Sequence, residues 1–89
     1  MANREASAGF LPGLAAQAEQ RQATPDGYRL TFAPSRATLA LITSMIAAER
    51  EYCRWLRFQL TVEPDDGPVV LVLSGPDGAT AFLKPLCDR

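Results

Sequence analysis

Histidine is absent from the 89-residue sequence, and the only cysteines are Cys53 and Cys87. The lack of histidine removes the commonest general base near neutral pH and the commonest ligand of zinc, copper and nickel. Two cysteines are too few for a disulfide-rich scaffold, and the absence of C-x-x-C spacing excludes a zinc ribbon or a thioredoxin-like motif. No recognisable catalytic constellation is left, so we expect a protein that is not an enzyme.

The sequence also lacks a long apolar run and a large excess of either charge. No uninterrupted apolar segment approaches the ~20 residues that span a bilayer, and the N-terminus lacks a charged region followed by a long apolar core. A net charge of −1 argues against nucleic acid as a general partner, for which a strongly basic balance is typical. We therefore expect a cytoplasmic protein with no membrane association.

The length and composition of the chain suit one small globular domain. Its residues are 47% apolar and 21% charged, which is ordinary for a folded protein, and they are too few for two separate cores. Residues 1–9 have little to bury, so we expect a disordered N-terminus there and a single domain over residues 10–89. A chain of this size buries only somewhat more than ~60% of its unfolded surface, which favours a shallow site or an interface over a deep cavity.

Apolar periodicity predicts three strands and three helices. Apolar and polar residues alternate in two segments and a third segment is continuously apolar, which indicates strands over residues 28–33, 58–63 and 69–73. Helical spacing predicts helices from about 12 to 22, from about 36 to 56 with Ser35 as N-cap, and from about 79 to 86.

The third strand is apolar on both faces, which is typical of the middle of a sheet. We therefore place it between the other two, in the order 1-3-2, so that all neighbouring strands are antiparallel. The long helix connects the first strand to the second and crosses one face. The predicted fold is α+β, with a three-stranded antiparallel sheet, one long crossover helix and short N- and C-terminal helices.

One acidic residue interrupts the apolar stripe of the long helix. Glu49 and Cys53 lie one turn apart, near the middle of the stripe that is formed by Leu39, Ile42, Ile46 and Leu56. Burying a carboxylate that has no partner is costly. Glu49 therefore requires an internal partner, a bound ligand, or a helix rotated so that Glu49 lies at the edge of the core.

The same junction between helix and strand carries arginines and the only tryptophan. Arg36, Arg50, Arg54 and Arg57 fall on one flank of the predicted helix, and such a strip either binds an anionic partner or is simply a solvated helix flank. Trp55 lies outside the apolar stripe. It is expected to pack against the N-terminal helix or to form a contact surface for a second chain.

The junction contains the string Glu49-Arg50-Glu51-Tyr52-Cys53-Arg54-Trp55-Leu56, followed by Gly67-Pro68 and by Leu73-Ser74-Gly75-Pro76-Asp77-Gly78. From about Leu11 to Leu83 the chain resembles an uncharacterised family of small bacterial proteins that have Glu-Arg, a cysteine pair with Pro-Phe-Leu, and similar turns. The resemblance implies thiol or soft-metal chemistry at the cysteine pair. Only the second cysteine of that pair is present in this chain, as Cys53, because Tyr52 stands in place of the first.

We interpret the protein as a small non-enzymatic binding or interaction module of the bacterial cytosol. It has no expected cofactor, and its partner is an unidentified protein or small ligand. The predicted binding residues are Glu49, Arg50, Cys53, Arg54, Trp55 and Arg57. Two alternatives stay open. One is a soft-metal or thiol-handling protein that uses Cys53 and Cys87 with Glu49, and the other is a structural domain that forms a homodimer through Trp55 or a sheet edge.

Overall fold

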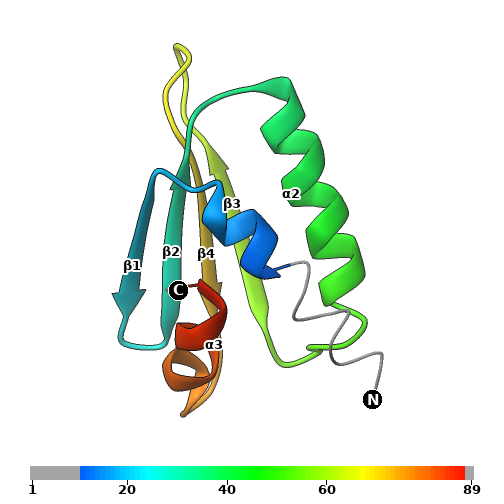
Figure 1. Ribbon diagram of the computed structural model, residues 1–89, viewed down its shortest axis with the longest axis vertical. Coiled ribbons are helices and arrows are strands. Elements are labelled where there is room, and N and C mark those ends of the chain that lie inside the picture. Colours follow the sequence, from blue (N-terminus) through cyan, green and yellow to red (C-terminus); the bar gives the residue numbers. More distant parts are fainter. Residues whose placement is uncertain (1–10, 88–89) are drawn as a thin grey trace.

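The computed structural model describes residues 11–87 of the chain. The elements follow in the order β1 (Gln20–Thr24), β2 (Gly27–Phe32), α2 (Arg36–Glu49), β3 (Arg57–Val62), β4 (Val69–Ser74) and α3 (Ala79–Cys87), and residues 11–16 are also helical (Figure 1). The strands form one antiparallel sheet in the order β1-β2-β4-β3. The disordered N-terminus expected for residues 1–9 lies outside the described residues.

Our prediction of a three-stranded sheet is wrong, because Gln20–Thr24 adds a fourth strand at one edge. The three expected strands do lie in the predicted relative order, with β4 in the middle. β1 is exposed along most of its length, so it lacks the apolar alternation that identifies a strand, and its Gln, Arg and Ala residues favour helices. It forms because the turn at residues 24–27 folds it back onto β2, from the pair Gln20↔Thr31 to the pair Thr24↔Gly27.

The N-terminal helix accordingly ends at residue 16 instead of near residue 22. Arg21 of β1 donates hydrogen bonds from Nη1 to the carbonyl oxygens of Ala15 (3.1 Å) and Ala18 (3.4 Å). The last carbonyls of a helix have no partner within it, and a basic side chain there stabilises them. The first strand therefore stabilises the end of the helix that precedes it.

α2 begins as predicted, because Ser35 Oγ accepts a hydrogen bond from the backbone N–H of Thr38 at 3.0 Å. It ends at Glu49, earlier than predicted, where the Glu49 carbonyl accepts from both Tyr52 N (2.9 Å) and Cys53 N (2.8 Å). The tighter turns that follow place Arg54 outside the helix. The expectation of four arginines along one helix flank is therefore wrong.

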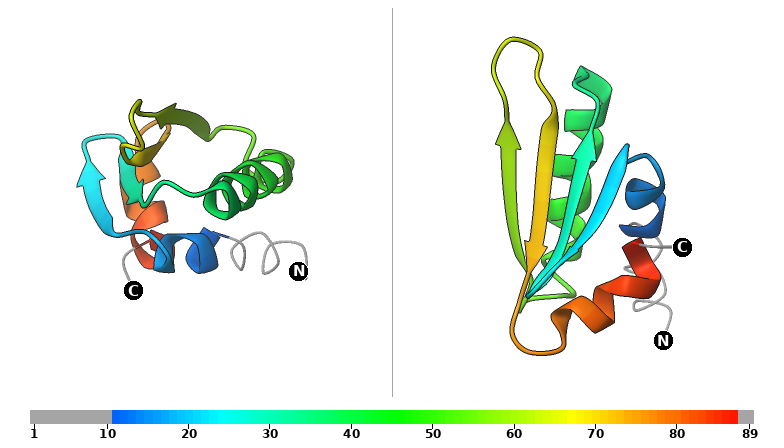
Figure 2. Two further views of the ribbon diagram at one scale, coloured as in Figure 1. Left: turned by 90° about the horizontal axis from the view of Figure 1, so that it is seen from above. Right: turned by 90° about the vertical axis from the view of Figure 1, so that its left-hand side faces the viewer.

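The core lies between one face of the sheet and the helices, which are all on that side (Figure 2). Leu30, Leu71, Leu73, Ile42 and Leu83 are 0% exposed. Residues 11–18 and α3 contribute to the same cluster, so both ends of the described chain contribute to one core. Among residues 11–87, no helix covers the opposite face of the sheet (Figure 2).

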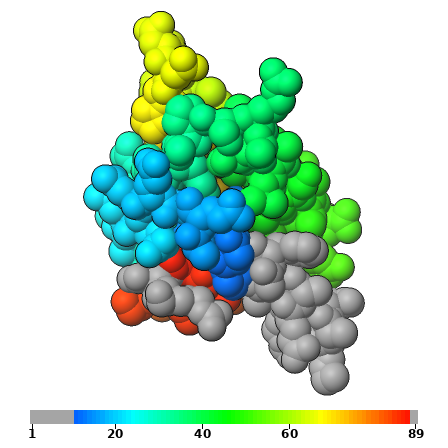
Figure 3. Space-filling view, turned by 45° about the horizontal axis from the view of Figure 1, so that its top comes forward, coloured from blue at the N-terminus to red at the C-terminus, as the bar shows by residue number. Residues whose placement is uncertain are grey.

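The loop between β3 and β4 projects from one end of the molecule (Figure 3). Asp65 and Asp66 in this loop both have φ of 58°, the left-handed region that acidic residues and Asn tolerate in turns. Within residues 11–87, no helix combines the length and the apolar content that crossing a bilayer requires.

Candidate partner-binding site

A groove of about 880 Å³ lies between α2 and β3, at the junction where the chain passes from helix to strand. We call it the α2–β3 groove. Its lining residues come from the outer flank of α2, the turn after it and the start of β3: Thr43, Ile46, Ala47, Arg50, Glu51, Arg54, Leu56 and Phe58.

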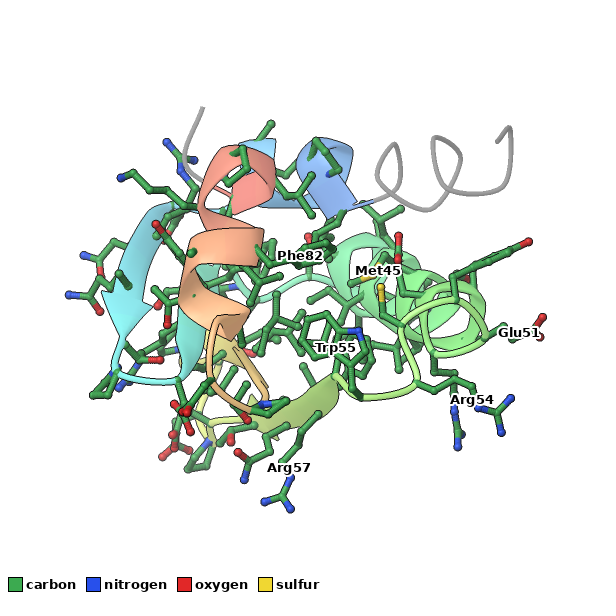
Figure 4. All side chains as sticks on the ribbon, turned by 90° about the horizontal axis from the view of Figure 1, so that it is seen from below. Met45, Glu51, Arg54, Trp55, Arg57 and Phe82 are labelled. Carbon is green, nitrogen blue, oxygen red and sulfur yellow. The ribbon has the colours of Figure 1, made fainter. Side chains whose placement is uncertain are left out.

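The α2–β3 groove has an apolar floor and a charged rim. Leu56 is buried and Ile46 and Phe58 are half-buried, whereas Arg50 and Arg54 are exposed. Figure 4 shows Arg54 directed outward from the turn after α2. Exposed guanidinium groups beside apolar surface suit a partner that carries both apolar and acidic groups.

The apolar side chains of β3 are only partly covered on the core face of the sheet. Phe58 and Leu60 are half-buried and Val62 is 54% exposed, whereas the β4 residues paired with them are all 0% exposed. Burial thus decreases sharply from the central strand to the edge strand. An incompletely covered apolar strip of this kind, next to the α2–β3 groove, is typical of an interaction surface.

Glu49 is 2% exposed, as its position in the helical stripe predicts, and its Oε2 atom is fully buried. This burial excludes the alternative of a helix rotated to place Glu49 at the edge of the core. Cys53 is half-buried and packs against the core cluster. The structure therefore brings carboxylate and thiol to the same end of α2, but neither lines the α2–β3 groove.

Cys87 lies in α3, where it lines a different cavity of about 420 Å³ together with Pro12, Ala15, Arg21 and other residues. In the part of the chain that the structure describes, no group of three or more Cys, Asp or Glu residues could hold a metal ion. The expected ligand set of Glu49, Cys53 and Cys87 is therefore not assembled among residues 11–87. Soft-metal binding by other means stays a prediction.

Trp55 is 43% exposed, and its indole ring lies against Gly75 and Phe82. A Cβ atom at Gly75 would lie 2.7 Å from Trp55 Cε3, so the ring requires a glycine beneath it. The Trp55 and Phe82 ring centroids are 5.2 Å apart at an interplanar angle of 78°, the edge-to-face geometry that aromatic pairs favour (Figure 4). This contact connects the turn after α2 to α3.

The predicted binding residues thus divide between separate surfaces. Arg50 and Arg54 line the α2–β3 groove, whereas Trp55 lines a shallower pocket of about 250 Å³ with Pro76 and Phe82. Arg57 begins β3, and its side chain points away from the molecule (Figure 4).

Sequence reasoning did not identify the apolar floor of the groove. The alternation in β3 predicted exposure of its polar face and burial of Phe58, Leu60 and Val62, so it pointed away from the site. It did not reveal that α2 leaves a space beside this strand, because that depends on the packing of residues distant in sequence.

The chain matches no model of a known protein family, no curated protein and no solved structure. The resemblance to a family of small bacterial proteins therefore stays a prediction.

Proposed function

We propose that the protein is a small non-enzymatic interaction module that binds a segment of another polypeptide in the α2–β3 groove. The observation that carries this proposal is the combination of an apolar floor with Arg50 and Arg54 at the rim. Apolar side chains of the partner would be removed from water on the floor, and acidic side chains would form charge-assisted hydrogen bonds with the guanidinium groups.

The openness of the groove favours a polypeptide over a small ligand. Five of its eight lining residues are exposed, whereas sites for small molecules enclose most of the ligand surface. The lining runs along α2 from Thr43 and continues past the end of the helix to Arg54. A chain that is several residues long can contact the whole of this length, which a compact ligand would leave largely unused.

The local charge supports an acidic polypeptide more than a nucleic acid. Arg50 and Arg54 stand at the rim with Glu51 between them in the sequence, and the net charge of the whole chain is −1. Binding to a phosphate backbone typically uses many basic residues and an overall basic domain. A cytoplasmic location belongs to the same proposal, because two cysteines are too few for the disulfide framework that is typical of small secreted domains.

Titration of the ¹⁵N-labelled protein with a synthetic peptide tests the proposal. The probe is acetyl-Val-Thr-Leu-Thr-Val-Glu-Glu-amide, which carries apolar and acidic side chains. We expect amide shift changes centred on residues 43–60. Changes confined to the uncovered face of the sheet, or no change at millimolar peptide, would contradict the proposal.

A matched pair of charge reversals separates recognition from general attraction. Arg50→Glu with Arg54→Glu should weaken binding of the probe more than tenfold, because both groove cations are lost. Arg29→Glu with Arg36→Glu changes the net charge by the same amount at exposed positions outside the groove. This control should weaken binding less than threefold at physiological salt, where charges more than ~8 Å apart are largely screened. Equal losses in both variants would indicate nonspecific attraction.

A further inference from the structure

β3 is an edge strand whose outer side is open. Its six residues pair continuously with β4, from Arg57↔Ser74 to Val62↔Val69, and among residues 11–87 no strand pairs with its other side. Figure 2 shows no described element beyond β3 on this side. Alternate backbone N–H and C=O groups of such a strand point outward and can accept a further strand.

The residues of β3 do not protect this edge. Proteins commonly block an exposed edge with proline, lysine, inward-pointing charge or a bulge. β3 has the sequence Arg-Phe-Gln-Leu-Thr-Val, with neither proline nor lysine, and its pairing with β4 contains no bulge. Its single charge, Arg57, is at the first position and points outward (Figure 4).

The position of the groove indicates where an added strand would lie. Neighbouring strands are about 4.8 Å apart, and residues opposite each other project to the same face. Every second side chain of a strand beside β3 would therefore share the face of Phe58, Leu60 and Val62, toward the flank of α2 that carries Ile46 and Ala47. The remaining side chains would project to the uncovered face.

We propose that the polypeptide segment bound in the α2–β3 groove adds to β3 as a fifth, antiparallel strand. This inference rests on the proposed function and specifies how the partner binds. The groove supplies contacts for alternate side chains, while the edge of β3 supplies backbone hydrogen bonds, the division of roles that is characteristic of strand addition.

The antiparallel direction fixes the chemistry of the segment. Residues opposite Val62, Leu60 and Phe58 follow one another toward the C-terminus of the partner, and these should be apolar. The segment then reaches the beginning of β3, where Arg57 is opposite it and Arg54 lies at the groove rim. Acidic residues belong there, so the predicted pattern is apolar-x-apolar-x-apolar followed by one or two acidic residues.

Peptides of identical composition test this pattern. The probe acetyl-Val-Thr-Leu-Thr-Val-Glu-Glu-amide has the required alternation and direction, whereas Val-Leu-Val-Thr-Thr-Glu-Glu loses the alternation and Glu-Glu-Val-Thr-Leu-Thr-Val reverses the direction. We expect each altered peptide to bind at least tenfold more weakly. Equal binding of all three would overturn strand addition while leaving the groove as a binding site, and failure of all three would overturn the proposed function itself.

Backbone methylation of the probe tests most directly whether its N–H groups form hydrogen bonds with β3. Two versions of the peptide carry N-methyl groups on alternate residues, one on the odd and one on the even positions. In an added strand, one set of N–H groups faces β3 and the other faces solvent, so one version should lose binding more than tenfold and the other less than threefold. Equal effects of the two versions would contradict the proposal.

Hydrogen exchange of the protein's own amides shows whether the peptide or a second copy of the protein pairs with the edge of β3. Alternate amides of β3 should become protected when the probe binds, and sedimentation across a concentration series shows whether the protein alone is a monomer. Protection of these amides in a self-associated protein before any peptide is added would overturn the proposal, because a second copy would then occupy the edge.

Discussion

The two edge strands of the sheet, β1 and β3, differ in the polarity of their side chains and in the segments that lie beside them. β1 is polar, and residues 11–18 and α3 lie beside it, with Arg21 bonded to two carbonyl groups of the first of these segments. β3 carries three apolar side chains that are incompletely covered on the core face. Both strands are edges of the sheet, but β1 is polar whereas β3 presents apolar side chains next to a groove. β3 is therefore the edge suited to pair with an apolar segment, as in proteins that bind peptides at one sheet edge.

The two edges also differ in how they are joined to the C-terminal part of the chain. Thr80 Oγ1 donates a hydrogen bond to the Thr24 carbonyl at 2.9 Å, and Gly75 N donates to the Asp26 carbonyl at 3.0 Å. These bonds connect the β1–β2 hairpin to the C-terminal part of the chain. On the β3 side, the turn before the strand meets the segment after β4 through the ring of Trp55 against Gly75.

Two glycine substitutions should show this difference most strongly. A Cβ atom at Gly27 would overlap the backbone carbonyl of Leu73, whereas at Gly75 it would meet the side chain of Trp55. Gly27→Ala should lower the free energy of unfolding by about 3 kcal/mol, because backbone in the middle of a sheet cannot move away. Gly75→Ala should cost about 1 kcal/mol, because an exposed ring can tilt.

Urea unfolding followed by circular dichroism measures both losses of stability. Tryptophan emission should shift to longer wavelength in Gly75→Ala, because the displaced ring becomes more solvated, and should be unchanged in folded Gly27→Ala. If Gly75→Ala were as destabilising as Gly27→Ala, the packing of Trp55 on Gly75 would be as rigid as the backbone between β2 and β4.

A lysine on each edge should affect peptide binding at β3 alone. Val62 and Ala23 are both exposed residues on edge strands that face the core side of the sheet. Val62→Lys should weaken binding of the alternating probe about tenfold, or ~1.4 kcal/mol, because a charge would replace the apolar contact opposite the first valine of the probe. Ala23→Lys should change the affinity less than twofold. Isothermal titration calorimetry measures both, and similar losses would show that β3 is not the pairing edge.

Removal of the Arg21 side chain should loosen only the β1 side. Arg21→Ala should lower the unfolding free energy by about 1 kcal/mol, since the carbonyls of Ala15 and Ala18 lose the hydrogen bonds donated by the guanidinium group. Hydrogen exchange of residues 11–18 should accelerate while that of β3 stays the same. Arg29→Ala, an exposed control on the uncovered face, should change stability by less than about 0.5 kcal/mol. Faster exchange throughout the sheet would contradict a local role of Arg21.

The sequence predicted those parts of the fold where an apolar pattern reflects burial. The central position of β4 followed from its continuous apolar run, and the burial of Glu49 followed from helical spacing. β1 was missed because an edge strand exposed on both faces has no such pattern. Its existence depends on pairing with β2, which local preferences do not encode.

Only two of the six predicted binding residues line the groove, and their role in binding stays a prediction. Arg50 and Arg54 were expected at the junction, and both line the groove. α2 ends at Glu49, several residues before the predicted end, because the chain forms turns there with hydrogen bonds to the Glu49 carbonyl. Arg54 and Arg57 therefore lie outside the helix. The groove depends on the distance between α2 and β3, which is set by packing throughout the core.

The joining of both ends of the described chain in one core has a consequence for biosynthesis. Leu11 and Leu14 are buried in the same cluster as Leu83 and Cys87, although the two leucines are synthesised well before the other pair. The early segments cannot acquire their final neighbours until α3 has emerged. Contacts between distant positions delay productive collapse, so the nascent chain should stay susceptible to proteases, and available to chaperones, until α3 has left the ribosome.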